Sequence, residues 1–73
     1  MQTKFKRHQI VIIKNPPNQD YVEYHEDVEP FKIETGMEGR INMLLSNGQY
    51  HVEIIDNKGN VLAYAPMSED DLE

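Results

Sequence analysis

Apolar and polar residues alternate along two segments, Arg40 to Leu45 and Tyr50 to Ile55, on either side of Asn47-Gly48. A period of two is typical of strands that bury one face. An Asn-Gly pair between two such segments favours a β-hairpin with a type I′ turn, which needs positive φ at both central residues. The sequence therefore predicts a hairpin over residues 40–55.

The alternation gives each strand of this hairpin two faces. The apolar face of the first strand consists of Ile41, Met43 and Leu45. On the second strand His51 and Glu53 lie on the polar face. Opposite charges on neighbouring strands attract, so we expect Arg40 to pair with Glu53. We interpret the polar face as the solvent side of the hairpin.

Two more strands are expected. His8 to Lys14 is short and β-branched and stops at Asn-Pro-Pro-Asn, and the run from Ile10 to Ile13 would be buried on both sides or lie in a barrel wall. Asn60 to Ala65 follows a turn at residues 56–59, and Pro66 is expected to end it.

The other segments are turns and loops. Residues 15–35 lack periodicity and form a long first loop, or in part a hairpin arm at residues 21–24. Gly36 and Gly39 indicate positive φ or a close backbone approach. Ser68, followed by acidic residues, is expected to cap a short C-terminal 3-10 turn, with Leu72 folded back onto the core.

Together these elements predict an all-β protein, a small SH3-like barrel of four to five antiparallel strands with a long first loop and a short C-terminal 3-10 turn. Seventy-three residues make a single domain, here residues 1–73. We expect residues 1–7 to be flexible and residues 68–73 to form an acidic tail.

Charge is distributed unevenly along the chain. The net charge is −6, yet residues 1–14 contain four basic residues and no acidic one, whereas residues 20–34 contain six acidic residues against Lys32. Nucleic-acid binders normally carry a basic excess, so the overall charge disfavours a polyanionic partner. No apolar run is long enough to span a membrane, and we expect a cytoplasmic protein.

The pattern of an apolar first strand, Thr35-Gly36-Met37-Glu38-Gly39, Tyr50 to Ile54, Gly59 and a closing Ser68 to Leu72 resembles small SH3-like barrel proteins of unknown function. The chain is more distantly similar to the barrels of the nitrile hydratase beta subunit and of a small photosystem I protein. The resemblance implies an interaction module or accessory subunit rather than a particular chemistry.

A narrower resemblance covers Gly39 to Ala65, which is similar to the opening of translation initiation factor one, an OB-fold protein that binds ribosomal RNA. Leu45-Ser46-Asn47 and Tyr50-His51-Val52-Glu53 carry the likeness. That family continues through further basic strands, whereas here an acidic segment follows Pro66. The resemblance implies RNA binding as the alternative function.

The sequence predicts no enzyme, no cofactor and no metal site. Cysteine is absent, and the three histidines are irregularly spaced, whereas a metal site needs three or four convergent ligands. Gly36 and Gly39 lack the Lys-Ser or Lys-Thr that follows a phosphate-binding loop. We interpret the many carboxylates of residues 20–34 as a solvated loop.

Our leading hypothesis is a protein-interaction module that binds a basic partner surface through the acidic loop at residues 20–34. Tyr21 and Tyr24 would anchor the partner, and Glu23, Glu26 and Asp27 would steer it. Tyrosines beside acids are also found where polyproline segments bind, but the Ala-Leu-Tyr-Asp-Tyr signature and tryptophan are absent.

The alternative is nucleic-acid binding through the N-terminus and the polar face of the hairpin. Its candidate residues are Lys4, Lys6, Arg7, Arg40 and His51. Exposed strand edges could also pair with a second copy, so we expect a monomer or a homodimer.

Overall fold

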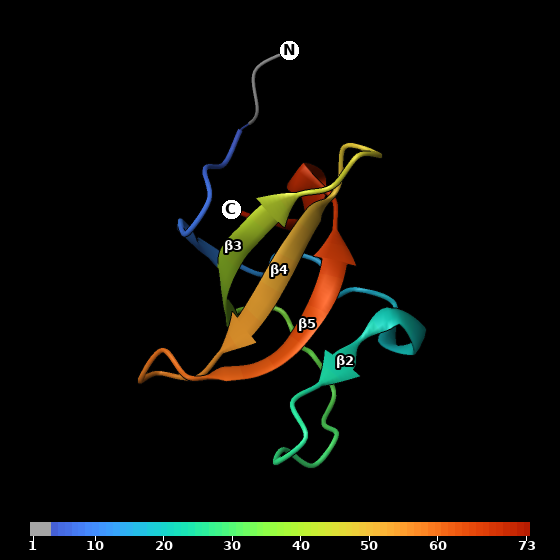
Figure 1. Cartoon of the computed structure of the whole chain (residues 1–73), viewed down its shortest axis with the longest axis vertical. Coiled ribbons are helices and arrows are strands. Elements are labelled where there is room, and N and C mark those ends of the chain that lie inside the picture. Colours follow the sequence, from blue (N-terminus) through green and yellow to red (C-terminus); the bar gives the residue numbers. More distant parts are fainter. Residues whose placement is uncertain (1–3) are drawn as a thin grey trace.

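A computed structural model describes residues 4–73 as one antiparallel sheet of five strands in the order β1-β3-β4-β5-β2 (Figure 1). The elements are β1 (Ile10–Ile12), the 3-10 turn η1 (Gln19–Tyr21), β2 (Glu23–Tyr24), β3 (Glu38–Leu44), β4 (Tyr50–Ile55), β5 (Val61–Met67) and the 3-10 turn η2 (Glu69–Asp71). The predictions of an all-β chain, of up to five antiparallel strands and of a C-terminal 3-10 turn are confirmed.

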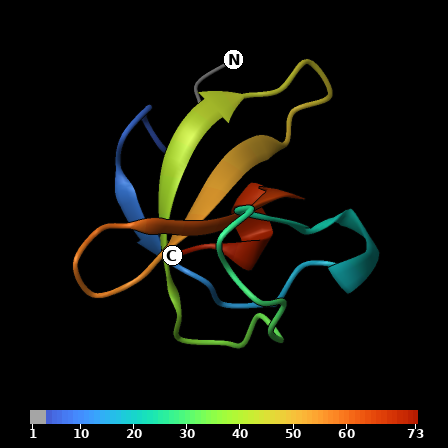
Figure 2. The same ribbon diagram turned by 60° about the horizontal axis from the view of Figure 1, so that its bottom comes forward.

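The sheet is a meander of β3, β4 and β5 with one short strand added on each side. β1 pairs with β3, and β2, from within the long first loop, pairs with β5. The C-terminal segment lies along the free edge of β1, where Ile12 and Glu73 exchange two backbone hydrogen bonds of 2.8 and 2.9 Å. Figure 2 shows the sheet curling so that the end of the chain lies next to β1.

The core fills the concave side of the sheet and takes in both ends of the described chain. Tyr50 is buried, as the sequence predicts. Phe5 is only 6% exposed; its ring meets that of Tyr50 edge-on at 5.7 Å, and its backbone N–H donates to the Tyr50 hydroxyl. Of the seven N-terminal residues expected to be flexible, 1–3 lie outside the described residues, while Phe5 is part of the core.

Ile10 and Ile12 of β1 are exposed, which differs from the sequence prediction. Val11 and Ile13 are buried, but Ile10 is 51% exposed. Ile12 is exposed as well, because no element packs on the convex side of β1. The expectation that the Ile10–Ile13 run is buried on both sides was therefore wrong.

The register of the hairpin also differs from simple alternation. Ile41 pairs with Val52, but Met43 pairs with His51, so Asn42 is an extra residue in β3. A bulge of this kind reverses which face later residues occupy. Met43 is consequently 45% exposed instead of pointing into the core.

The Asn-Gly turn is a three-residue loop rather than a two-residue type I′ turn. Gly48 has φ +85°, whereas Asn47 is not among the residues with positive φ. The Gly48 N–H donates to the Leu45 carbonyl, and Leu45 and Gln49 close the loop through a 2.7 Å backbone bond. This is a type I turn followed by a left-handed glycine, the usual solution for three-residue loops.

Pro66 does not end the third strand of the meander. β5 continues to Met67, and Pro66 sits opposite His51. On its other side β5 is paired only at Ala63 and Tyr64. Beyond them β5 has a free edge, where the missing N–H of proline leaves no ladder bond unmade.

The remaining turn predictions are confirmed. Gly36 has φ +97°, and Gly39 lies so close to β4 that a Cβ on it would be 2.8 Å from Val52 Cγ1. The Ser68 hydroxyl caps η2 by accepting from the Asp70 N–H, and Leu72 is buried beside Ile13.

Candidate functional site

The long first loop is held together by the Gln19 side chain at the start of η1. Its amide nitrogen donates to the Tyr24 hydroxyl at 2.8 Å, and its amide oxygen accepts from the Ile33 N–H at 2.9 Å. Ile33 is completely buried, so the loop is attached to the core at its far end. The loop at residues 20–34 is therefore held in a defined conformation.

Tyr24, expected to anchor a partner, is used inside this loop. Its hydroxyl donates to the Phe31 carbonyl, and the two rings meet edge-on with centroids 5.3 Å apart. Both side chains pack against the hydrophobic core. Tyr24 therefore stabilises the loop. The sequence alone did not show whether its side chain packs inward in this way or is exposed to a partner.

The other four candidate residues of the loop are exposed but lie in three places. Tyr21, in η1, is 65% exposed. Glu23 lies in β2, opposite Tyr64 of β5. Glu26 and Asp27 are at the tip of a turn closed by a Val28-to-His25 backbone bond. Tyr21 lines a groove to which these three acids do not belong.

The groove has a volume of about 540 Å³, within the range of about 300–1,000 Å³ usual for ligand sites. Three parts of the chain form it: residues 16–21, the turn between β3 and β4, and the junction of β5 with η2. Its apolar lining consists of Pro16, Pro17, Tyr21, Leu45, Pro66 and Met67. Rigid prolines and an exposed aromatic ring lose little conformational entropy when they are covered.

Polar groups complete the groove. Asn18, Asn47, Gln49 and Ser68 line it, and Asp71 is the one charged lining residue. The neighbouring segments add Asp20, Glu69 and Asp70. Among residues 4–73, no lysine, arginine or histidine lines the groove. Its electrostatic character is therefore acidic, as in the adjoining loop.

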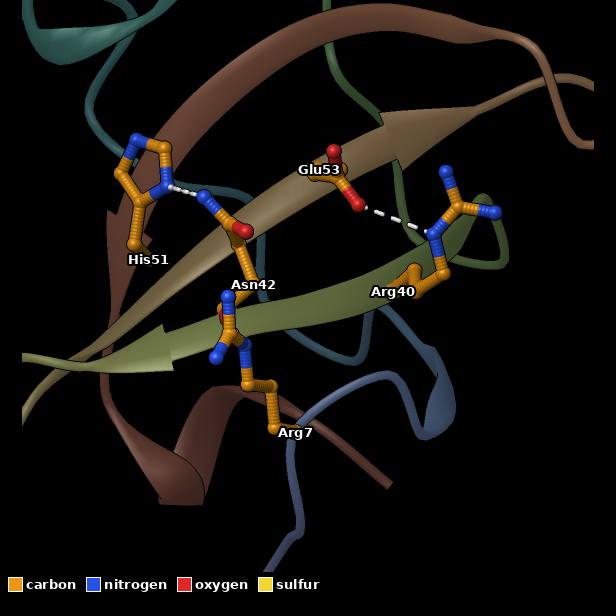
Figure 3. Close-up of polar contacts among 5 residues, drawn as sticks. All are labelled: Arg7, Arg40, Asn42, His51 and Glu53. Atoms are coloured by element: carbon orange, nitrogen blue, oxygen red, sulfur yellow. Dashed lines mark hydrogen bonds and ion pairs between the residues drawn. The ribbon is translucent and has the colours of Figure 1, made fainter.

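The convex face of the hairpin carries the second group of candidate residues. Arg40 donates to Glu53 across β3 and β4 at 2.9 Å, which confirms the predicted pair (Figure 3). His51 Nδ1 lies 3.0 Å from the Asn42 amide nitrogen. The Arg7 Nε donates to the Asn42 backbone carbonyl at 3.1 Å.

One row of side chains crosses the whole sheet on this face. The pairing partners in order are Ile10, Arg40, Glu53, Tyr64 and Glu23. The Tyr64 ring of this row stacks on the His51 ring, with the ring centroids 5.4 Å apart and an interplanar angle of 17°. The negative charges of Glu53 and Glu23 offset the positive charges of Arg40 and Arg7, so this face is not a basic surface.

The remaining basic candidates are Lys4 and Lys6. Lys4 is exposed, with Nζ 5.3 Å from the centre of the Phe5 ring. Lys6 is also exposed, and its N–H donates to the Gln9 side chain. The structure therefore links Arg7 and His51 through Asn42, pairs Arg40 with Glu53, and gives the two lysines separate contacts.

Two further features, a cluster of metal ligands and a membrane-spanning helix, can be assessed over residues 4–73. In that range no three His, Cys, Asp or Glu side chains converge as metal ligands would. Nor does any helix described by the structure combine the length and the apolar composition that crossing a bilayer requires.

The groove is the feature that sequence reasoning missed. Tyr21 was the only lining residue among the predicted site residues. The sequence pattern predicts strand stops at Pro16-Pro17 and at Pro66, whereas the structure brings these three prolines together with Tyr21 in the lining of one groove. That proximity depends on η2 folding back to β1, which no local pattern encodes.

Comparison with known proteins gives no relative: no family model, no curated protein and no solved structure matches the chain.

Proposed function

We propose that this protein is a non-enzymatic protein-interaction module that holds an extended, basic segment of a partner in the groove between η1, the β3–β4 turn and η2. The observation that carries the proposal is the groove itself, with an apolar floor, an exposed Tyr21 and acidic residues around it. This moves the docking site from the 20–34 loop as a whole to the groove beside its start, with Tyr21 common to both.

The partner's charge follows from that of the chain. The net charge is −6, and Asp71 in the groove is flanked by the acids of η1 and η2. Such a field attracts a basic segment and accelerates its association. Glu23, Glu26 and Asp27, which lie outside the groove lining, contribute to steering.

The proposal includes an SH3-like arrangement of the sheet. It is supported by the long first loop, the three-stranded meander, the short 3-10 turn and the return of the C-terminal segment to β1. In this arrangement the first loop and η2 are brought to the same end of the meander. We place the module in the cytoplasm.

Self-association would have to use a surface other than the β1 edge. That edge is occupied by the C-terminal segment, and β2 at the opposite edge is only two residues long. The edge of β5 beyond β2 is free, but Pro66 within it has no N–H to pair with another strand. We therefore propose a monomer, because no edge of the sheet offers a long run of unpaired groups to a second copy.

Site-directed photo-crosslinking tests the proposed function. Benzoylphenylalanine replaces Tyr21 in the groove, and in the matched control it replaces Met43, which is exposed but outside the lining. In an extract of the source cells, the first probe should form an adduct with a protein segment rich in Lys or Arg. Equal labelling from both positions, or labelling from Met43 alone, would contradict the proposal.

RNA binding remains the second candidate, because the His51 and Tyr64 rings are stacked and Arg7, like His51, is bonded to Asn42. Aromatic rings next to an arginine can stack on unpaired bases. Fluorescence anisotropy with single-stranded RNA at two salt concentrations tests it. An RNA binder must lose affinity steeply as salt rises, whereas no measurable binding at low salt would remove this candidate.

A further inference from the structure

Asp71 holds a distinctive position in the groove. It is half-buried, ends η2, and is the one charged side chain of the lining. Its backbone carbonyl accepts from the N–H groups of Lys14 and Asn15 at 2.8 and 3.2 Å. The Asn15 amide nitrogen lies 3.3 Å from Asp71 Oδ1 and donates to it. Both the backbone and the carboxylate of Asp71 are thus held in place by the segment after β1.

The carboxylate has no cationic partner within residues 4–73. The one ion pair in that range is between Arg40 and Glu53, on the convex face of the sheet. Only one of the two carboxylate oxygens accepts a side-chain hydrogen bond, from Asn15. A charged group fixed in this way, without a counter-ion, can accept a cation from a ligand.

The neutral polar side chains of the groove have oxygens that already accept hydrogen bonds from backbone N–H groups. Asn18 Oδ1 accepts from the Asp20 N–H, Asn47 Oδ1 from the Gln49 N–H, and Ser68 Oγ from the Asp70 N–H. Within the described chain, the amide nitrogens of Asn18 and Gln49 and the Ser68 hydroxyl hydrogen make no hydrogen bond. Each of these oxygens already accepts one hydrogen bond, so the unused donors are the groups most readily available to a ligand.

Resting on the proposed function, we infer that Asp71 determines specificity by pairing with a Lys or Arg side chain of the bound segment. The donors of Asn18, Gln49 and Ser68 bind the segment's backbone carbonyls, and its apolar residues cover Tyr21 and the prolines. Asn15 is a positioning residue that holds the carboxylate. Acidic segments are rejected, because they would place like charges together in the groove.

Selection from a random peptide display library tests this inference on the whole 73-residue chain. The variants are Asp71→Asn and, as the matched control, Asp70→Asn, which removes the same charge from the exposed neighbour outside the lining. The wild type and Asp70→Asn should enrich peptides that contain Lys or Arg beside apolar residues. Asp71→Asn should lose this preference.

The selected peptide then gives a quantitative measurement. Replacing its basic residue by Gln should weaken binding to the wild type about two- to fivefold, the range for a partly exposed charge pair, and leave binding to Asp71→Asn unchanged. Replacing Asn15 by Ala should reduce this charge discrimination, whereas Asn15→Gln, which keeps the amide donor, should restore part of it.

The outcomes separate the inference from the function on which it rests. Peptides that bind the groove without a basic residue, or an equal loss of preference in both variants, would overturn the role of Asp71 and leave the interaction module standing. If no peptide is enriched on the wild type, both the inference and the proposed function fail. Circular dichroism establishes that each variant is folded before binding is measured.

Discussion

Leu72 lies beside Ile13 in an isolated antiparallel bridge, and both side chains are fully buried. This contact joins the end of the described chain to its first strand. It also positions η2, and therefore Asp71, against Lys14 and Asn15. One wall of the groove thus depends on a hydrophobic contact in the core.

Replacing Leu72 by Ala should lower the free energy of unfolding by about 3 kcal/mol, because it removes buried methyl groups and leaves a cavity. Urea denaturation followed by circular dichroism measures the change. Glu73→Gln, an exposed neighbour that keeps its backbone bonds to Ile12, is the control and should change stability by less than about 0.5 kcal/mol. Equal effects of the two substitutions would show that the Leu72 side chain is not buried.

Replacing Gly39 by Ala should destabilise the protein by about 2 kcal/mol, because the added Cβ would meet Val52 Cγ1 at 2.8 Å and the Glu53 carbonyl at 3.3 Å. The same substitution in a Val52→Ala background should cost less than half as much. Identical costs in the two backgrounds would mean that β3 and β4 do not approach each other at this position.

Arg40 and Glu53 should show a small coupling energy. Their side chains are 29% and 16% exposed, so water screens part of the attraction. A double-mutant cycle with Arg40→Gln and Glu53→Gln should give about 0.5–1 kcal/mol, decreasing as salt is added. A coupling of zero at low salt would contradict the observed pair.

Asp56 should make stability depend on pH in the acid range. The N–H groups of Asn60 and Lys58 donate to its carboxylate and hold its pKa below the ordinary value of 3.8. A lowered folded-state pKa stabilises the protein above 3.8, and the contribution is lost as pH falls through the folded pKa. The stability difference between wild type and Asp56→Asn should therefore shrink below pH 3.8, and a difference that grows with acid would be contrary to this.

Much of the fold could be predicted because its information is local. The alternation from Arg40 to Ile55, the Ser68 cap and the two glycines of residues 36–39 each indicate a backbone conformation directly. The errors come from tertiary context. The bulge at Asn42 exposes Met43, and the free edge of β5 admits Pro66. Neither the register nor the length of a neighbouring strand can be determined from one segment alone.

The candidate site was harder to predict for the same reason. The Arg40–Glu53 pair followed from hairpin register, so the sequence was sufficient. Tyr21 and Tyr24 are alike in sequence, yet Gln19 and Phe31 bind one of them inside the loop and leave the other exposed. The groove unites segments separated by about fifty residues, and only the folded chain brings them together.

The most direct test of the docking surface is a titration of the ¹⁵N-labelled protein with the selected basic peptide, followed by amide chemical shifts. The largest changes should fall on groove residues such as Asn18, Tyr21, Gln49 and Ser68. Changes centred instead on Asn42 and His51, with the groove amides unmoved, would contradict the account and transfer binding to the convex face of the sheet.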